Sequence, residues 1–354
     1  MGKKIALLVI FGGISSEHEV SCSSAASILD RIDTKKYEIH KIGITKTGKW
    51  LLTKADTQFI ASGAWEDAPD NMMAAVSPDR SVGGICTESG EVIRIDCVFP
   101  VLHGKYGEDG TLQGLLEIAG LPFVGSGTLA SACCMDKVVT KILVEGLGVR
   151  QPKYFTAERD DFMKRPAETA ADVEDAMGHE YPLFVKPANA GSSVGISKVN
   201  DIKELISGMR EAAAEDHKMI VEETITGREM EVAVLGNKSP AASAIGEIMA
   251  ANEFYDYDAK YTNEKSRTEI VADISSEKSL EMRTAAVDIY STLGCRGMAR
   301  VDFFLTEDKE VVFSEVNTIP GFTKISMYPK LWTAAGLEYG DLIDKLIDLA
   351  MEDN

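Results

Sequence analysis

Short apolar runs alternate with amphipathic stretches along the first third of the chain. The apolar runs at residues 5–11, 38–44 and 98–102 have the length of buried strands. Helical periodicity occupies residues 20–31 and begins again near residue 111. This alternation predicts a parallel sheet with helices on its faces, because parallel neighbours are joined by crossover helices. It restricts the chain to an α/β class more strongly than any other feature of the sequence.

The chain has 354 residues, which predicts two or three domains. We place one boundary near Asp136, beside a helical stretch, and a second at the turn before Thr226-Gly227. The expected units are an N-terminal α/β substrate domain, a central domain and a C-terminal domain, at residues 1–136, 137–223 and 224–354. Residues 337–351 have helical periodicity and an acidic finish, which predicts a surface helix.

Composition excludes several classes of protein. Lys and Arg number 37 and Asp and Glu 56, for a net charge of −19, so nucleic acid and anionic membrane surfaces are unsuitable partners. No apolar run approaches the roughly 18 residues of a membrane span. The six cysteines lack metal-finger spacing, and the N-terminus lacks a small-residue cleavage site. We therefore expect a cytoplasmic protein with reduced thiols.

The most informative stretch is a predicted hairpin rich in carboxylates. A two-residue turn at residues 308–309 would place Asp302 opposite Glu315 and Arg300 opposite Asn317, all on one face. Two carboxylates and an amide oxygen beside an Arg suit Mg²⁺ that bridges phosphates. A solvated face or a plain Arg–Asp pair is the alternative. The same register would also set two aromatic rings opposite each other on that face, Phe304 and Phe313, which disfavours a solvated face.

A small-residue loop follows a strand-borne lysine at residues 186–195. Backbone N–H groups of such a loop, with Lys186, can surround phosphate oxygens. The Walker pattern is absent, and a Gly-Ser loop alone is more often a hairpin turn. Lys137 could supply a second charge for phosphate, which strengthens the phosphate interpretation.

Two glycine-rich segments, residues 12–21 and 103–113, follow predicted strands of the first domain. Ligands of parallel sheets bind beyond the carboxyl ends of strands, so a small substrate is expected there. Helix capping by Ser15, Ser16 and Glu19 is the simpler alternative. Residues 252–265 are aromatic, polar and poorly periodic, which fits either an exposed loop or a lid that excludes water.

Taken in order, six segments resemble the D-alanine:D-alanine ligases of the ATP-grasp superfamily, and the resemblance covers nearly the whole chain. These segments are residues 12–21, 103–113, 186–195, 254–261, 300–317 and 318–323. The resemblance implies an N-terminal parallel α/β domain followed by two domains whose mainly antiparallel sheets clamp ATP.

The resemblance also implies the site residues. For ATP these are Lys137, Lys186, Glu222, Glu223, Ile225, Glu229, Phe254 and Phe304. For two Mg²⁺ ions, with Mn²⁺ as a substitute, they are Asp302, Glu315 and Asn317. For catalysis they are Glu17, Ser192, Tyr261, Arg300 and Gly321, and for substrate binding they are His103, Lys260, Ser326 and Met327.

The implied activity joins two D-alanines through an acyl phosphate, for peptidoglycan precursor synthesis, and the family predicts a homodimer. D-alanine:D-serine and D-alanine:D-lactate ligases remain alternatives; Tyr261 disfavours D-lactate, and apolar Met327 disfavours D-serine. The role of Lys324 stays open. A nucleotide-binding regulator without turnover is disfavoured by the carboxylate hairpin, and an oxidoreductase by the missing G-x-G-x-x-G pattern.

Overall fold

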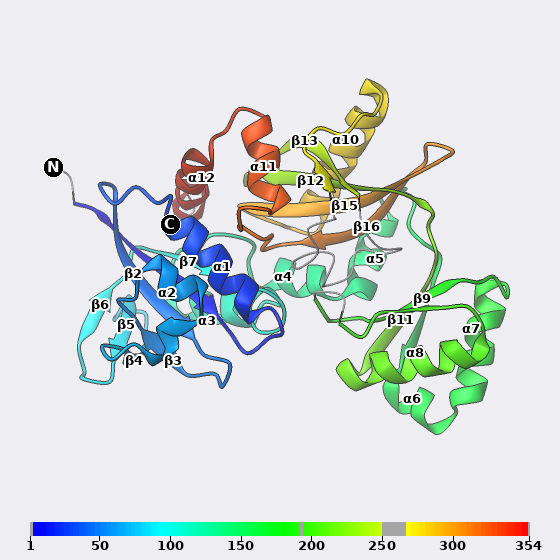
Figure 1. The fold of residues 1–354 in the computed structure, drawn as a ribbon, viewed down its shortest axis with the longest axis horizontal. Coiled ribbons are helices and arrows are strands. Elements are labelled where there is room, and N and C mark those ends of the chain that lie inside the picture. The colour runs from blue at the N-terminus through cyan, green and yellow to red at the C-terminus, as the bar shows by residue number, and fades with distance from the viewer. Residues whose placement is uncertain (1–2, 192–193, 250–266, 353–354) are drawn as a thin grey trace.

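The described strands form three sheets, arranged side by side in a computed structural model (Figure 1). The structure describes residues 3–191, 194–249 and 267–352. The first sheet lies on the left of Figure 1, the second at the lower right, and the third above and between them. This arrangement is the predicted class, a parallel α/β unit followed by two antiparallel sheets.

The first sheet has seven strands in the order β6-β5-β4-β3-β2-β1-β7. Its strands are β1 (Ile5–Gly12), β2 (Tyr37–Ile44), β3 (Trp50–Leu52), β4 (Met72–Val76), β5 (Gly84–Thr87), β6 (Val92–Arg94) and β7 (Cys97–Val101). Only β2, β1 and β7 are parallel, as expected, whereas β3 to β6 add an antiparallel extension that the apolar pattern did not predict. Its helices are α1 (His18–Leu29), α2 (Thr57–Ala61), the 3₁₀ turn η1 (Ala64–Asp67), α3 (Thr111–Ala119) and α4 (Thr128–Met135).

Strand β1 is buried on both faces, which explains its continuous apolar run. Leu7 and Val9 belong to the core that contains α1, whereas Leu8 and Ile10 belong to the core that contains α3. Side chains alternate along a strand, so a strand covered on two sides must be apolar throughout. Strand β1 is therefore accessible to ligands only at its carboxyl end.

The second sheet is antiparallel, in the order β10-β9-β11-β8. Its strands are β8 (Tyr154–Glu158), β9 (Leu183–Pro187), β10 (Ser197–Val199) and β11 (Lys218–Glu223). Its helices are α5 (Lys137–Glu145), α6 (Arg159–Lys164), α7 (Pro166–Met177) and α8 (Ile202–Glu215). The core of this unit lies between the sheet and α6 to α8, while Val138 of α5 contacts Ile220 on the opposite face.

The third sheet is also antiparallel, in the order β14-β13-β12-β15-β16. Its strands are β12 (Gly227–Leu235), β13 (Ala241–Met249), β14 (Arg267–Glu269), β15 (Met298–Thr306) and β16 (Val311–Asn317). Helix α10 (Ser276–Thr292) covers the apolar face, where Val232, Val301 and Phe303 are buried. The polar residues of β12, β15 and β16 therefore share the other face.

The C-terminal helix has the exposed polar face that its sequence pattern predicted, and its apolar face is buried against the first sheet. Helix α11 (Met327–Ala334) precedes α12 (Tyr339–Met351), whose Ile343 and Leu346 are fully buried. They lie in the same core as Leu7 of β1 and Phe99 of β7. The chain thus returns to its first sheet, as the red and blue segments of Figure 1 show.

The β15–β16 hairpin has the expected pairing at its site end but a different turn. Asp302 pairs with Glu315 and Arg300 with Asn317, as predicted. The turn contains three residues, and Lys309 adopts a left-handed conformation there. A bulge at Ser314 then restores the register, because Phe303 pairs with Phe313. The expected Phe304–Phe313 pair is therefore wrong.

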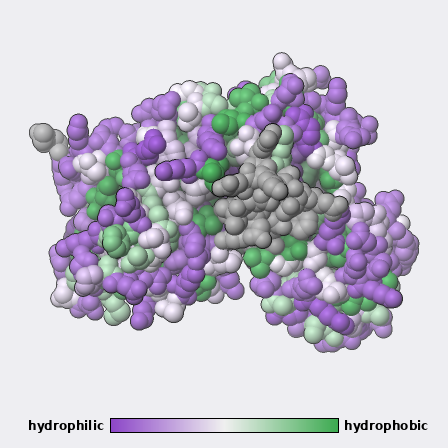
Figure 2. Space-filling view, viewed as in Figure 1, coloured by the Kyte–Doolittle hydropathy of each residue, from purple (hydrophilic) through white to green (hydrophobic). Residues whose placement is uncertain are grey.

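Hydrophilic residues cover most of the face seen in Figure 2, in keeping with the strongly acidic composition. Over residues 3–191, 194–249 and 267–352, no helix has the length and apolar character needed to cross a membrane.

Candidate active site

Glu17 lies where three segments meet at the carboxyl end of the first sheet. Its side chain is buried, and its backbone N–H donates to Ser15 Oγ at 3.2 Å. A Cβ atom on Gly104, or one on Gly191, would lie only 2.6 Å from Glu17 Oε2. The two glycines therefore let the backbone after β7 and the backbone after β9 approach this carboxylate.

His103 connects the first sheet to the segment after β16. Its Nδ1 lies 3.0 Å from the carbonyl oxygen of Ile319, so Nδ1 carries the proton and donates it. Its Nε2 then accepts from Ser24 Oγ at 3.3 Å, and Ser24 Oγ accepts from Phe322 N–H. Burial lowers the pKa of His103, which favours this neutral ring. His103 is thus placed to position the Gly321 segment.

Lys186 and Glu222 project from neighbouring strands of the second sheet and form an ion pair at 2.6 Å. Lys141 of α5 pairs with the other oxygen of Glu222 at 2.8 Å. Burial alone would raise the pKa of Glu222, but the two lysines hold it at about 2. Burial opposes the charge of Lys186 as well, yet Glu222 keeps its pKa above the ordinary value. Two lysines thus share one carboxylate here, and lysine ammonium groups are donors that suit an anionic ligand.

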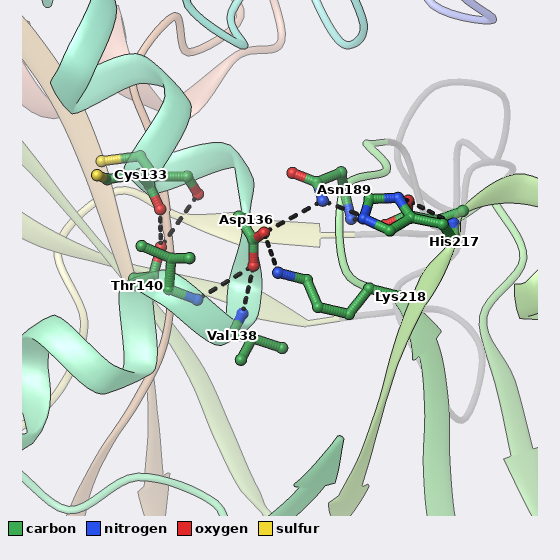
Figure 3. Close-up of polar contacts among 10 residues, drawn as sticks. Cys133, Asp136, Val138, Thr140, Asn189, His217 and Lys218 are labelled. Atoms are coloured by element: carbon green, nitrogen blue, oxygen red, sulfur yellow. Dashed lines mark hydrogen bonds and ion pairs between the residues drawn. The ribbon is translucent and has the colours of Figure 1, made fainter. Parts of the chain in front are cut away.

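The segment that follows β9, residues 188–191, is held against α5 by a polar network (Figure 3). Asp136 caps α5 through the N–H groups of Val138 and Val139, and it pairs with Lys218 of β11. Asn189 donates to Asp136 at 3.3 Å and to Asp216 at 3.2 Å. One residue beyond Asp136, Lys137 Nζ donates to the carbonyl oxygen of Ala190 at 2.8 Å. Lys137 and this segment are therefore fixed relative to each other.

The carboxylate hairpin contributes the polar face of the third sheet. Arg300 donates to both oxygens of Asp302, at 2.8 and 2.7 Å, and lies 3.2 Å from Glu231 of β12. Asn317 donates to Asp302 at 3.0 Å. Burial opposes the charge of Arg300, but Asp302 and Glu231 hold its pKa above the ordinary value. Arg300 is therefore a fixed cation among carboxylates.

Mg²⁺ fits this face by the chemistry of its donors. Asp302 and Glu315 are directly opposed, and Asn317 lies beside them with an amide oxygen. No group of three acidic, His or Cys side chains gathers around one point in the described part of the chain. Two carboxylates are nevertheless typical for Mg²⁺, which takes its remaining ligands from phosphates and water.

Gly321 and Ser326 lie together just after the hairpin. A Cβ atom on Gly321 would lie 2.8 Å from Ser326 Oγ, which also accepts from Thr323 N–H at 3.0 Å. Met327 is the first residue of α11, and its side chain packs in the core above Gly246. The structure thus gives Met327 a packing role, and its contact with a substrate stays a prediction.

The predicted nucleotide segment spans the junction of the second and third sheets. Glu223 ends β11 and accepts from Lys153 N–H at 2.9 Å, and half-buried Ile225 follows in the connection to β12. On β12, Glu229 pairs with Phe304 of β15. Glu229 and Glu315 both raise the pKa of Lys186, so the polar faces of the two sheets are near each other. Four further predicted residues lie outside the described residues: Ser192, Phe254, Lys260 and Tyr261.

Sequence reasoning missed three residues of the site. Lys141 lies one helical turn after Lys137, and a lysine on the buried stripe of an amphipathic helix is the signal that could have found it. Glu108 accepts from Gly104 N–H at 2.9 Å, and burial together with the charge of Glu17 raises its pKa to about 8. Ser24 had no signal, because small polar residues on a helix are common.

Two models of the D-ala D-ala ligase family match the chain: the N-terminal model at residues 6–126 and the C-terminal model at residues 143–348. D-alanine–D-alanine ligase B of Clostridium tetani is 49% identical over 99% of this chain and 94% of its own length. D-alanine–D-alanine ligase of Clostridium novyi is 47% identical over 99% of both chains.

Solved structures agree over the same length. VanG D-Ala:D-Ser ligase from Enterococcus faecalis has a TM-score of 0.89 and 44% identity, over 98% of this chain and all of its own. The D-alanine–D-alanine ligase from Coxiella burnetii has a TM-score of 0.87 and 35% identity, over 99% of this chain and 95% of its own. With both family models matched and both relatives aligned from end to end, the chain belongs to the D-alanine–D-alanine ligase family, whose members are ATP-dependent ligases of the ATP-grasp fold.

Proposed function

We propose that the chain joins two D-alanine molecules into D-alanyl-D-alanine, a peptidoglycan precursor, with conversion of ATP to ADP and phosphate. The observation that carries this proposal is that the lysine pair of the second sheet, Lys186 with Lys141, lies near the carboxylate face of the third sheet, whose Glu315 acts on the charge of Lys186. Glu17 lies beside Gly191, in the segment that follows Lys186. ATP and an amino acid can therefore bind side by side.

The first half-reaction needs an activated carboxylate. Glu17 receives the ammonium group of the first D-alanine, and the substrate's carboxylate attacks the γ-phosphorus of ATP to give an acyl phosphate and ADP. Lys137 and Lys186 neutralise the phosphate charge. Asp302, Glu315 and Asn317 would hold Mg²⁺, which supplies further neutralisation of the phosphate oxygens when bound.

The second half-reaction forms the peptide bond. The amine of the second D-alanine attacks the acyl carbon, and phosphate leaves from the tetrahedral intermediate. Arg300 and the Gly321 N–H stabilise the oxyanion of that intermediate, and Ser326 binds the second carboxylate. Ser192, Lys260 and Tyr261 complete the site in this proposal, with Phe254 and Phe304 on either side of adenine.

Three further features belong to this proposal. The chain divides into units at residues 1–136, 137–223 and 224–354, supported by the strands of the three sheets. It acts as a homodimer, as its family resemblance implies. It works in the cytoplasm, where its substrate ATP is available.

ADP release is the direct test of the activity. We expect release that requires both D-alanine and a divalent cation, Mg²⁺ or Mn²⁺. ADP release without D-alanine, or none with it, would contradict the ligase proposal. Glu315→Gln should abolish turnover and leave the unfolding temperature near that of the wild type; near-normal activity of this variant at low Mg²⁺ would contradict the metal assignment.

Competition between D-alanine and D-serine at equal concentration tests the second substrate. We expect mainly D-alanyl-D-alanine when the dipeptides are separated by mass. The two Clostridium relatives are named D-alanine–D-alanine ligases, whereas VanG, whose identity to this chain is similar, is a D-Ala:D-Ser ligase. A majority of D-alanyl-D-serine would assign the chain to the alternative.

A further inference from the structure

One buried cation of the site has no role in the reaction steps above. Lys141 projects from α5, one helical turn after Lys137, and only 2% of its side chain is exposed. Its Nζ lies 2.8 Å from Glu222 Oε1 and 5.4 Å above the ring centre of Tyr154. A lysine is rarely buried so completely unless it is paired, and here the partner is Glu222.

The strand register explains how Lys141 reaches Glu222. Glu222 pairs with Tyr154 of β8 and with Phe184 of β9, so these three side chains share one face of the second sheet. Lys186, two residues along β9 from Phe184, is on the same face. Helix α5 packs over this face, and the side chain of Lys141 extends from α5 to Glu222.

The two lysines pair with different oxygens of one carboxylate, and their side chains differ in solvent exposure. Lys186 holds Glu222 Oε2 at 2.6 Å, and 21% of its side chain is exposed. Lys141 holds Oε1 and is nearly inaccessible. Only Lys186 can therefore turn toward a bound phosphate while the other lysine remains in place.

We propose that Lys141 is a positioning residue for ATP: it stays on Glu222 when Lys186 turns to the phosphates, and it keeps the carboxylate ionised and fixed. This inference rests on the proposed function, because Lys186 is placed there against the phosphates of ATP. Without Lys141, Glu222 would be a buried carboxylate with Lys186 as its main cation. ATP would then have to compete with Glu222 for Lys186, and nucleotide affinity would fall.

Lys141→Met tests the inference by titration calorimetry with ATP and Mg²⁺ in the absence of D-alanine. We expect the Kd for ATP to rise by about tenfold, because ATP must then compete with Glu222 for Lys186. The KM for D-alanine at saturating ATP should change less than about twofold, since Lys141 acts only through Glu222. Lys203→Met, at an exposed position on α8, is the matched control and should bind ATP like the wild type.

A double-mutant cycle with Glu222→Gln separates positioning from general damage. If Lys141 acts through Glu222, the double variant should bind ATP no more weakly than Glu222→Gln alone. Additive losses in the double variant, an unchanged Kd for ATP in Lys141→Met, or an equal rise of the Kd for ATP and the KM for D-alanine would overturn the inference. Should Lys141→Met fail to fold, Lys141→Gln enters the same cycle. If the wild-type chain binds no ATP, the proposed function fails instead.

Discussion

At the scale of single residues, Glu108 places a protonated carboxyl next to a carboxylate. Burial and the charge of Glu17 raise the pKa of Glu108 from 4.5 to about 8, so the folded protein retains a proton that the unfolded chain releases above pH 4.5. The stabilisation is complete below that pH and is lost as the pH rises toward 8. Without ligands, the free energy of unfolding should therefore fall across this window.

Glu108→Gln should remove most of this pH dependence, because the amide has no proton to lose. Urea unfolding at pH 5 and pH 8 measures the slope, and Glu307→Gln, at an exposed position of the β15–β16 turn, should leave it unchanged. A slope in Glu108→Gln equal to that of the wild type would show that other groups cause it.

A second prediction at this scale concerns Gly191. A side chain would not fit at this position, although its backbone conformation is open to other residues. A Cβ atom there would lie 2.6 Å from Glu17 Oε2, while the same atom on Gly146 would meet nothing within 4 Å. Gly191→Ala should displace Glu17 and lower kcat/KM for D-alanine on the order of 10²-fold. Gly146→Ala should leave activity unchanged. Equal activity of the two variants would mean that the backbone at Gly191 moves to accommodate the added methyl group.

At the scale of elements, the bulge at Ser314 determines which face of the third sheet carries the side chain of Glu315. It compensates the three-residue turn, so that Glu315 and Asn317 share a face with Asp302. Deletion of Ser314 should turn either Glu315 or Phe313 to the wrong face, because side chains alternate along a strand. A carboxylate forced into the α10 core costs several kcal/mol.

The deletion should therefore give little soluble protein or a large fall in the unfolding midpoint. Ser314→Ala keeps the bulge and should change the free energy of unfolding by less than about 0.5 kcal/mol. A deletion variant that folds and keeps full activity would show that the register is not set by this residue.

The hairpin also shows how far sequence reasoning can go. The carboxylates of Asp302 and Glu315 were paired correctly because residue types at alternate positions mark a polar face. The turn and the bulge were not predicted, since either a two-residue turn or a three-residue turn with a bulge gives the same pairing at the site. Lys141 and Glu108 were missed because their importance depends on burial, which contacts from distant segments create.

At the scale of the whole molecule, α12 joins the end of the chain to its beginning. Leu346 is fully buried in the core that contains Leu7 and Phe99 of the first sheet, and Lys36 pairs with Asp344 at 2.5 Å. Tyr339 donates to the carbonyl oxygen of Phe322, so the same helix supports the segment beside Gly321. The amphipathic pattern of α12 revealed its apolar stripe but not the sheet that covers it, because the partner strands lie more than 200 residues away in the sequence.

Leu346→Ala should therefore destabilise the first sheet as well as the helix. We expect a loss of about 2 to 5 kcal/mol in urea unfolding, the usual effect of removing a buried leucine side chain. Hydrogen exchange should become faster in β1 and β7, far from the substitution in sequence, because these strands share its core. Lys345→Ala, at the exposed neighbour, should change neither quantity. A loss below about 1 kcal/mol with unchanged exchange in β1 would mean that α12 contributes little to the core of the first sheet.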